Sequence, residues 1–286
     1  MLASESAAQI DDAALGRPAL VIPFEDAVSL GVASDAVYVV DVATGTLTRL
    51  GLDTDSATTF AGGATRLAGP TDVDPTHGLT VWLSDAVASR LYRLTREFAV
   101  VEEIDLGRPV GSDAARLEAG GQTVVVPRHI AVVDERTIVM IDGQTSRVIW
   151  WSRDRGFERY HGSTGVRASD FEPVDVVSTP RSVIVAEQVS GCLFTFDLIG
   201  SLLGRSACDP TSDLVAINRS AGRLWVTRRI EGGTLIESRY DDGRLARRFR
   251  VQSDLRIRQA AGAAGRIWMI AEDGLYVAAV PGRADE

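Results

Sequence analysis

The sequence contains no lysine. All 30 of its basic residues are arginine, against 39 Asp and Glu residues, and the formal net charge is −9. A nucleic-acid-binding surface needs concentrated basic charge, so this acidic balance argues against DNA or RNA as a partner. Such a composition fits GC-rich codon usage and also adaptation to high salt. Neither explanation points to a particular reaction.

Long apolar runs are missing as well. No stretch approaches the roughly 18 consecutive apolar residues of a membrane-spanning helix, so we expect no transmembrane segment. Residues 1–18 show neither the basic nor the apolar region of a signal peptide, and we expect them to form an N-terminal tail. The compartment therefore stays open at this point.

Cysteine is scarce. Cys192 and Cys208 form no CxxC or Cys/His pattern, which argues against a structural metal site. They flank the turn FDLIGSLL, and the alternatives are a disulfide across that turn or a diagonal pair too far apart to bond. A disulfide would indicate an oxidising compartment such as a bacterial cell envelope.

The sequence does contain an apolar run that occurs six times. The run TVWLSD (80–85) has five counterparts, which are AVYVVD (36–41), TIVMID (137–142), SVIVAE (182–187), RLWVTR (223–228) and RIWMIA (266–271). The third residues of successive runs are 44, 57, 45, 41 and 43 positions apart. This spacing is typical of a propeller blade, and strand-like stretches and polar turns flank each run. The sequence therefore predicts an all-β fold, a six-bladed β-propeller of four-stranded antiparallel blades.

The last copy of this repeat is one strand short. It ends with the third strand, GLYVAAV (274–280), whereas ALVIPFED (19–26) precedes the first copy and is otherwise unassigned. We expect these two segments to pair, because a closed ring hides the edges that an open array would expose. The predicted organisation is a tail over 1–18 and one propeller domain over 19–286.

One copy resembles a known repeat. The stretch GPTDVDPTHGLTVWLSDAVASRLYRL (69–94) has a Pro-led strand, an apolar strand ending in Asp, and a turn leading to Arg and a third strand. In this order of features it resembles an NHL repeat, although the fifth and sixth copies keep only the spacing. The resemblance implies an NHL-like six-bladed propeller. Relatives with this fold include binding scaffolds, sugar-acid lactonases and a peptide-amidating lyase, so the fold alone does not choose a function.

The Asp and Arg of this motif have a structural interpretation. They lie five residues apart around equivalent turns in two copies, as Asp85 and Arg90 and as Asp142 and Arg147. We predict that each pair forms a cross-turn contact that ties two strands of a blade together.

Three residues are candidate ligands at the start of inner strands. Asp72, His129 and Asp175 each follow a strand-opening proline by two positions, so they should occupy equivalent places in three blades. Together they could bind a divalent cation. Hydrogen bonding to the neighbouring blades is the alternative, and our prediction is that the protein has no cofactor. Arg128 belongs to the same candidate binding region.

Loops supply the other candidates. His161, Arg167 and Asp170 lie in a connection between blades that should edge the mouth of the propeller, and we predict that they contact a ligand. The stretch 108–126 is an insertion that should rise over the same mouth; it either confers specificity or is neutral length variation. His77 is expected in a surface turn.

The enzymes among the relatives lack support. The amidating lyase type carries His directly after the inner-strand prolines, where this chain has Thr71, Arg128 and Val174. The lactonase type needs Asn among its metal ligands, and Asn218 is the single Asn of the chain. The sequence also has no Gly-x-Ser-x-Gly elbow and no phosphate-binding loop.

We therefore predict a non-catalytic binding or scaffold propeller. It would hold a protein, peptide or glycan partner, and a bacterial cell envelope is the favoured location. The alternatives are a metal-dependent, lactonase-like hydrolase or lyase, and a subunit of a larger complex. The sequence leaves the oligomeric state open.

Overall fold

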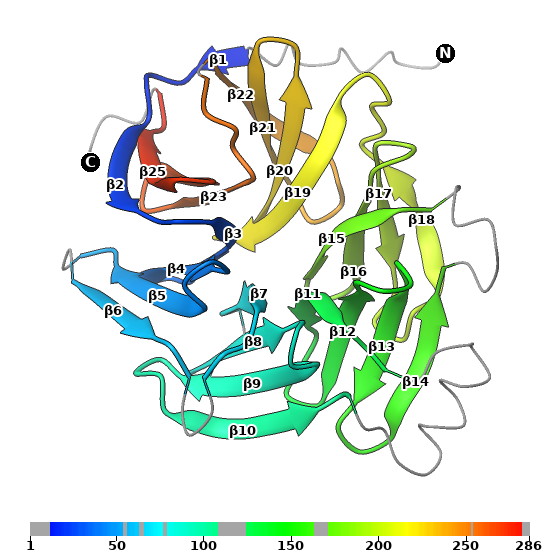
Figure 1. Ribbon diagram of the computed structural model, residues 1–286. Helices are drawn as coiled ribbons and strands as arrows, with labels where there is room; N and C mark the ends of the chain where they lie inside the picture. The colour runs from blue at the N-terminus through cyan, green and yellow to red at the C-terminus, as the bar shows by residue number, and fades with distance from the viewer. Residues whose placement is uncertain are drawn as a thin grey trace, which may run out of the picture.

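The protein is described from a computed structural model, which covers residues 12–53, 56–62, 66–76, 79–107, 124–162, 171–252 and 254–281. These residues form 25 β-strands and no helix. Six sheets surround a central channel, with their first strands nearest the centre (Figure 1). Nowhere in the described ranges is there a helix long and apolar enough to cross a membrane.

Each sheet is one blade. Its four main strands follow one another in order from the channel to the outside of the ring. Blades one to three contain β3 (Ala27–Val32), β4 (Ala36–Asp41), β5 (Thr46–Gly51) and β6 (Ala57–Phe60); β7 (Pro70–Asp74), β8 (Thr80–Asp85), β9 (Arg90–Thr95) and β10 (Val100–Asp105); and β11 (Pro127–Val132), β12 (Thr137–Asp142), β13 (Val148–Ser152) and β14 (Gly156–His161). Blades four to six contain β15 (Pro173–Ser178), β16 (Val183–Glu187), β17 (Cys192–Phe196) and β18 (Leu202–Ser206); β19 (Asp213–Ser220), β20 (Arg223–Ile230), β21 (Gly233–Arg239) and β22 (Leu245–Val251); and β23 (Gln259–Ala263), β24 (Arg266–Ala271), β25 (Gly274–Ala279) and β2 (Ala19–Pro23).

The predicted six-bladed β-propeller is thereby confirmed. The six repeated apolar runs are the second strands of the blades, and they are buried because both faces of each blade pack against a neighbour. The N-terminal strand closes the ring: β2 pairs antiparallel with β25, with Ala19 opposite Val277 and Leu20 opposite Tyr276.

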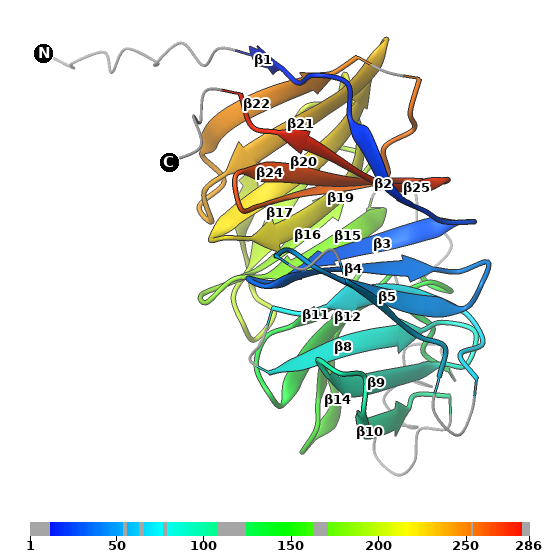
Figure 2. The same cartoon turned by 90° about the vertical axis from the view of Figure 1, so that its left-hand side faces the viewer.

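The N-terminal segment also reaches a second blade. Strand β1 (Asp12–Ala14) pairs parallel with β22, which makes blade five a five-stranded sheet. In Figure 2, β1 lies beside β22, and the chain then continues to the start of β2. The sequence did not predict this strand, because three residues are too few to show an alternating pattern.

The core is divided among the junctions between blades. Six apolar clusters fill the structure, and each takes its residues mainly from two adjacent blades. The junction of blades five and six shows how closely they pack. A Cβ atom on Gly262 would lie 1.9 Å from Cζ2 of Trp225, so β23 needs glycine where that indole ring lies against it. At this junction a large side chain on a second strand thus packs against a glycine on the next inner strand.

Asp85 and Arg90 lie opposite each other across the β8–β9 turn, but their side chains have different partners. Asp85 is fully buried and accepts the backbone N–H groups of Ala68 (2.7 Å), Gly69 (3.0 Å) and Ala88 (2.9 Å). The guanidinium of Arg90 instead lies 2.7 Å from the carboxylate of Glu103 on the next strand outward. The carboxylate of Asp85 accepts loop N–H groups that have no other acceptor among the described residues, whereas a guanidinium can only donate.

The same arrangement recurs in three other blades. Asp142 accepts the N–H of Val126 (2.7 Å) and of Thr145 (2.8 Å), while Arg147 places its guanidinium over the ring of Tyr160 at 4.7 Å. Asp41 and Glu187 hold the corresponding loops of blades one and four. The carboxylate therefore ties the connection between blades to the blade itself.

Blade five has a buried arginine in this place. Arg228 donates to the carbonyl oxygens of Gly191 (3.1 Å) and Ala207 (2.6 Å) on blade four. These residues immediately precede Cys192 and Cys208, which are joined by a disulfide. The arginine and the disulfide thus fasten the same corner of blade four.

Candidate functional site

Each inner strand contributes one residue to a ring around the channel. The ring consists of Ser29, Asp72, His129, Asp175, Ala216 and Gln259, and all six line one cavity of about 390 Å³. In blades one to five the pairing of the inner strand with the second strand is irregular just before the ring residue. The ring lies where the inner strands begin, and we call this end of the channel the mouth.

Most ring side chains connect one blade to the next. Each of these side chains accepts one backbone N–H group. Ser29 accepts that of Val73 (3.3 Å), Asp72 that of Ile130 (2.7 Å), Asp175 that of Ile217 (3.0 Å) and Gln259 that of Leu30 (2.6 Å). In every case the donor directly follows the ring residue of the next blade. The contacts satisfy backbone groups that the strand irregularity leaves unpaired.

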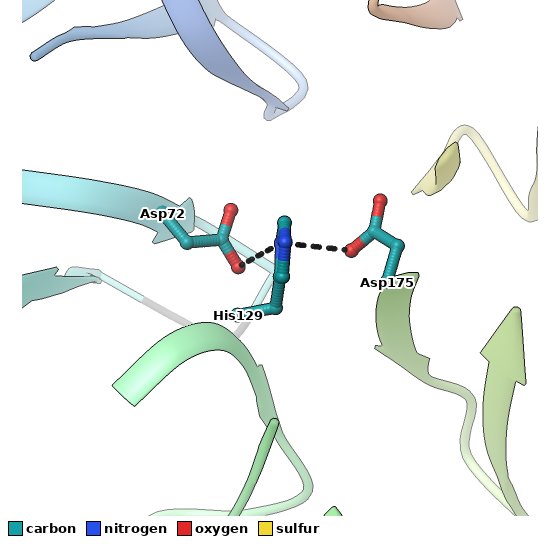
Figure 3. A group of neighbouring side chains, drawn as sticks. All are labelled: Asp72, His129 and Asp175. Atoms are coloured by element: carbon teal, nitrogen blue, oxygen red, sulfur yellow. Dashed lines mark ion pairs between the residues drawn. The ribbon is translucent and has the colours of Figure 1, made fainter. Parts of the chain in front are cut away.

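His129 departs from this pattern. The equivalent donor, the N–H of Val176, is taken by Oδ1 of Asp175 at 2.8 Å. Nδ1 of His129 is buried and has no hydrogen-bond partner among the described residues. It lies 3.5 Å from Oδ1 of Asp175 and 3.9 Å from Oδ2 of Asp72. Figure 3 shows the imidazole standing between the two carboxyl groups, with Nδ1 facing both.

Burial dominates the electrostatics of these three groups. Desolvation raises the pKa of Asp72 to about 7, although hydrogen bonds from Ser29 and Ile130 oppose it. Desolvation and the nearby Asp72 carboxylate raise the pKa of Asp175 well above its ordinary value. Burial lowers the pKa of His129 to about 3. The neutral imidazole of His129 thus lies between the carboxyl groups of Asp72 and Asp175. Among the described residues, neither carboxyl group has a cationic side chain as an ion-pair partner.

Arginines surround the mouth above this cluster. Arg128, Arg229 and Arg258 line the cavity, and they come from blades three, five and six. Arg258 is held by Asp26, at 2.5 Å. Arg128 and Arg229 are exposed, and neither forms a side-chain hydrogen bond or ion pair with another described residue. The apolar side chains of Val28, Val174, Leu214 and Val215 complete the walls. This cavity can hold an anionic group attached to an apolar one.

The predicted site residues have different fates. The structure brings Asp72, Arg128, His129 and Asp175 together. It places His161 elsewhere, at the end of the outer strand β14, where the ring packs against Phe171 and Phe196 and burial lowers the histidine pKa. His77, Arg167, Asp170 and all of the 108–126 insertion except 124–126 lie outside the described residues.

Sequence reasoning missed several cavity residues. Ser29, Ala216 and Gln259 complete the ring, and Arg229 and Arg258 lie on its rim. Ser29 follows Ala27 by two positions as Asp72 follows Pro70, so the register of the inner strands could have identified it. Blades five and six have no proline two positions before the ring residue, so the sequence did not mark their cavity residues.

Comparison with known proteins supports the architecture. No protein-family model matches the chain, and no curated protein sequence does. Its fold is similar to that of a catalytically inactive virginiamycin B lyase from Staphylococcus aureus with quinupristin (TM-score 0.62, 11% identity, 92% of this chain and 98% of that one). It is also similar to a streptogramin B lyase (TM-score 0.60, 12% identity, 92% and 96%) and to YCF48 bound to D1 peptide (TM-score 0.58, 10% identity, 96% and 100%). At such identities the likeness shows the fold alone.

Proposed function

We propose that the chain is a non-catalytic binding propeller whose mouth holds an acidic segment of a protein or peptide partner. The observation that carries this proposal is the pair of exposed arginines, Arg128 and Arg229, on one cavity. A guanidinium group binds a carboxylate through two parallel hydrogen bonds, which makes arginine well suited to acidic side chains and chain termini. Three arginines line this cavity beside one exposed acidic residue, Asp213, in a molecule whose net charge is −9.

The apolar features of the mouth favour a polypeptide over a glycan. Val87 is 74% exposed in the β8–β9 turn beside Gly69, and Val189 is 53% exposed next to the cavity residue Gln188. These valines offer contacts to residues that flank an acidic group. Sugars commonly stack on the rings of Phe, Tyr or Trp, and none of these three is among the described residues that line the cavity. The peptide complex of YCF48 is an example of a protein of this fold holding a peptide.

Three finer assignments belong to the same proposal. We infer an NHL-like family relationship from the motif at 69–94, and one domain over 19–286 from the repeat and its closure. The Cys192–Cys208 disulfide supports an oxidising compartment, for which a bacterial cell envelope is our proposal.

A second function is favoured by a different observation. The cluster of Asp72, His129 and Asp175 at the cavity floor supports a metal-dependent hydrolase or lyase, since an open metal site can polarise a bound substrate. Hydrolysis or elimination activity that disappears in the His129→Gln variant would establish this alternative.

The binding proposal can be tested with defined peptides. The probes are fluorescent decapeptides containing Asp or Glu, each compared with its Asn or Gln counterpart, on the full chain. We expect acidic peptides to bind more tightly, with affinity falling as salt rises, and Arg128→Gln with Arg229→Gln to weaken binding at least tenfold. Arg136→Gln is the matched control, because Arg136 lies in the same blade as Arg128, at the β11–β12 turn. Equal binding of acidic and amide peptides, or wild-type affinity in the double variant, would refute the proposal.

A further inference from the structure

We propose that Asp72, His129 and Asp175 bind one divalent first-row transition-metal ion, such as Mn²⁺ or Zn²⁺, at the floor of the mouth cavity. The inference goes beyond the proposed binding function, because the arginines of the rim could hold an acidic partner without any metal. The second function named above would depend on it. It rests on the spacing of three donor atoms, on an unused buried nitrogen, and on the hydrogen bonds that orient the carboxylates.

The spacing fits an ion better than it fits direct hydrogen bonds. Nδ1 of His129 lies 3.5 Å and 3.9 Å from the two carboxylates, and one ligand atom from each of the three residues lies within 4.8 Å of the others. A nitrogen–oxygen hydrogen bond would be about 2.7–3.2 Å long. Donor atoms that share an ion at about 2.0–2.6 Å are spaced farther apart than that, as they are here.

The second observation is that Nδ1 of His129 is not used in any hydrogen bond with a described residue. Its side chain is 16% exposed, but Nδ1 itself is buried without a hydrogen-bond partner. The other polar side chains of the ring are all hydrogen-bonded. A buried polar atom without a partner is costly, and a metal ion bound to Nδ1 removes that cost.

The carboxylates are held in place by neighbouring groups. Oδ1 of Asp72 accepts the hydroxyl of Ser29 at 2.5 Å, and Oδ2 accepts the N–H of Ile130. Oδ2 of Asp175 accepts the side-chain amide of Gln259 at 3.1 Å. Such contacts to metal-binding carboxylates fix their orientation and strengthen metal binding.

The donor set narrows the identity of the ion. Mg²⁺ and Ca²⁺ prefer oxygen ligands alone, whereas one imidazole with two carboxylates suits Mn²⁺, Fe²⁺ or Zn²⁺. Three protein ligands leave at least one coordination position for water or a ligand oxygen, as in metal sites that bind substrates. The cavity lies directly against the three residues, so that position would face the mouth.

Calorimetric titration of the chelator-treated full chain with MnCl₂ and with ZnCl₂ tests the site. We expect one ion per chain, and at least tenfold weaker binding in His129→Gln and in Asp72→Asn. His161→Gln and Asp213→Asn are matched controls that should bind as wild type; His161 lies on the outer strand of the same blade, and Asp213 lines the cavity outside the cluster. Absence of stoichiometric binding by the wild type, or wild-type affinity in His129→Gln, would overturn the proposal.

A spectroscopic measurement keeps the proposal falsifiable if a variant fails to fold. Pulsed electron paramagnetic resonance of the Mn²⁺-loaded wild type should show coupling to one directly bound histidine nitrogen. A spectrum with oxygen ligands alone would rule out the site. The peptide-binding result with Arg128 and Arg229 variants does not depend on this outcome, so the two proposals fail separately.

Discussion

Oε1 of Gln259 accepts the backbone N–H of Leu30 at 2.6 Å, so blade six is hydrogen-bonded to blade one beside the channel. Nε2 of the same side chain donates to the carbonyl oxygen of Ile217 on blade five at 3.1 Å. This uncharged side chain therefore connects blade six to blades one and five, and its contact with Asp175 adds blade four.

Replacing Gln259 should destabilise the ring. Gln259→Ala leaves the N–H of Leu30 and the carbonyl of Ile217 buried without these partners, and each unsatisfied group costs about 1–3 kcal/mol. Urea unfolding should therefore give a free energy of unfolding lower by about 2 kcal/mol or more. Gln252→Ala, at an exposed position, is the control and should change it by less than about 0.5 kcal/mol. Equal stability of the two variants would show that the Gln259 contacts are dispensable.

The fold was largely predictable because the second strands carry most of its signal. Each is an apolar run buried from both sides, and six such runs at near-constant spacing identify the blades even where the motif is lost. Closure by residues 19–26 followed from counting strands. The parallel pairing of β1 could not be predicted from the sequence, because it depends on the unpaired outer edge of β22, which exists only in the folded blade.

The site was predictable only in part. Prolines marked the inner strands of blades two, three and four, and so pointed to Asp72, His129 and Asp175. Whether a ring side chain bonds to the next blade or stays unused depends on which N–H group it meets. Asp175 accepts the N–H of Val176, whereas Nδ1 of His129 accepts none. This difference depends on small shifts in atom positions, which the spacing of residues in the sequence does not reveal.

The closing strand makes the N-terminus essential for stability. Deletion of residues 1–26 removes β2 and exposes the edge of β25, together with the apolar cluster that Ile22 and Phe24 cover. We expect a clear fall in melting temperature and rapid proteolysis. Deletion of 1–16 is the matched control; it removes β1 and Leu15 but keeps the closure, and should cost less. A Δ1–26 protein that melts with the wild type would refute closure as a source of stability.

Glu187 should make stability depend on pH. It is fully buried, and although burial would raise its pKa, hydrogen bonds from Ser190 and from the N–H groups of Glu172 and Val189 lower it below the ordinary value of 4.5. A group with a lowered pKa in the folded state stabilises the protein above its unfolded pKa, and this contribution is lost as the pH falls through the folded pKa.

The Glu187→Gln variant tests this assignment. It should be less stable than the wild type at pH 7, because a Gln amide cannot accept at both positions, and the difference should shrink below pH 4.5. Glu231→Gln, in the exposed β20–β21 turn, provides the comparison. Chemical denaturation across pH 3–8 supplies the data, and a difference that stays constant over this range would contradict the role of the carboxylate.

The contacts of Arg228 predict that it and the disulfide act together. Its guanidinium holds the carbonyls of Gly191 and Ala207, the residues just before the two bonded cysteines. Replacing both cysteines by serine releases a loop whose ends are 16 residues apart, which should lower the free energy of unfolding by about 3 kcal/mol. Arg228→Met should also destabilise the protein, because it leaves buried carbonyls and the carboxylate of Glu237 with fewer partners.

The two changes should not be additive. Once the disulfide is gone, the carbonyls are no longer fixed in reach of the guanidinium, so the combined variant should lose less stability than the sum of the separate losses. A double-mutant cycle from urea unfolding measures this coupling. Strict additivity would mean that the arginine and the disulfide stabilise blade four independently.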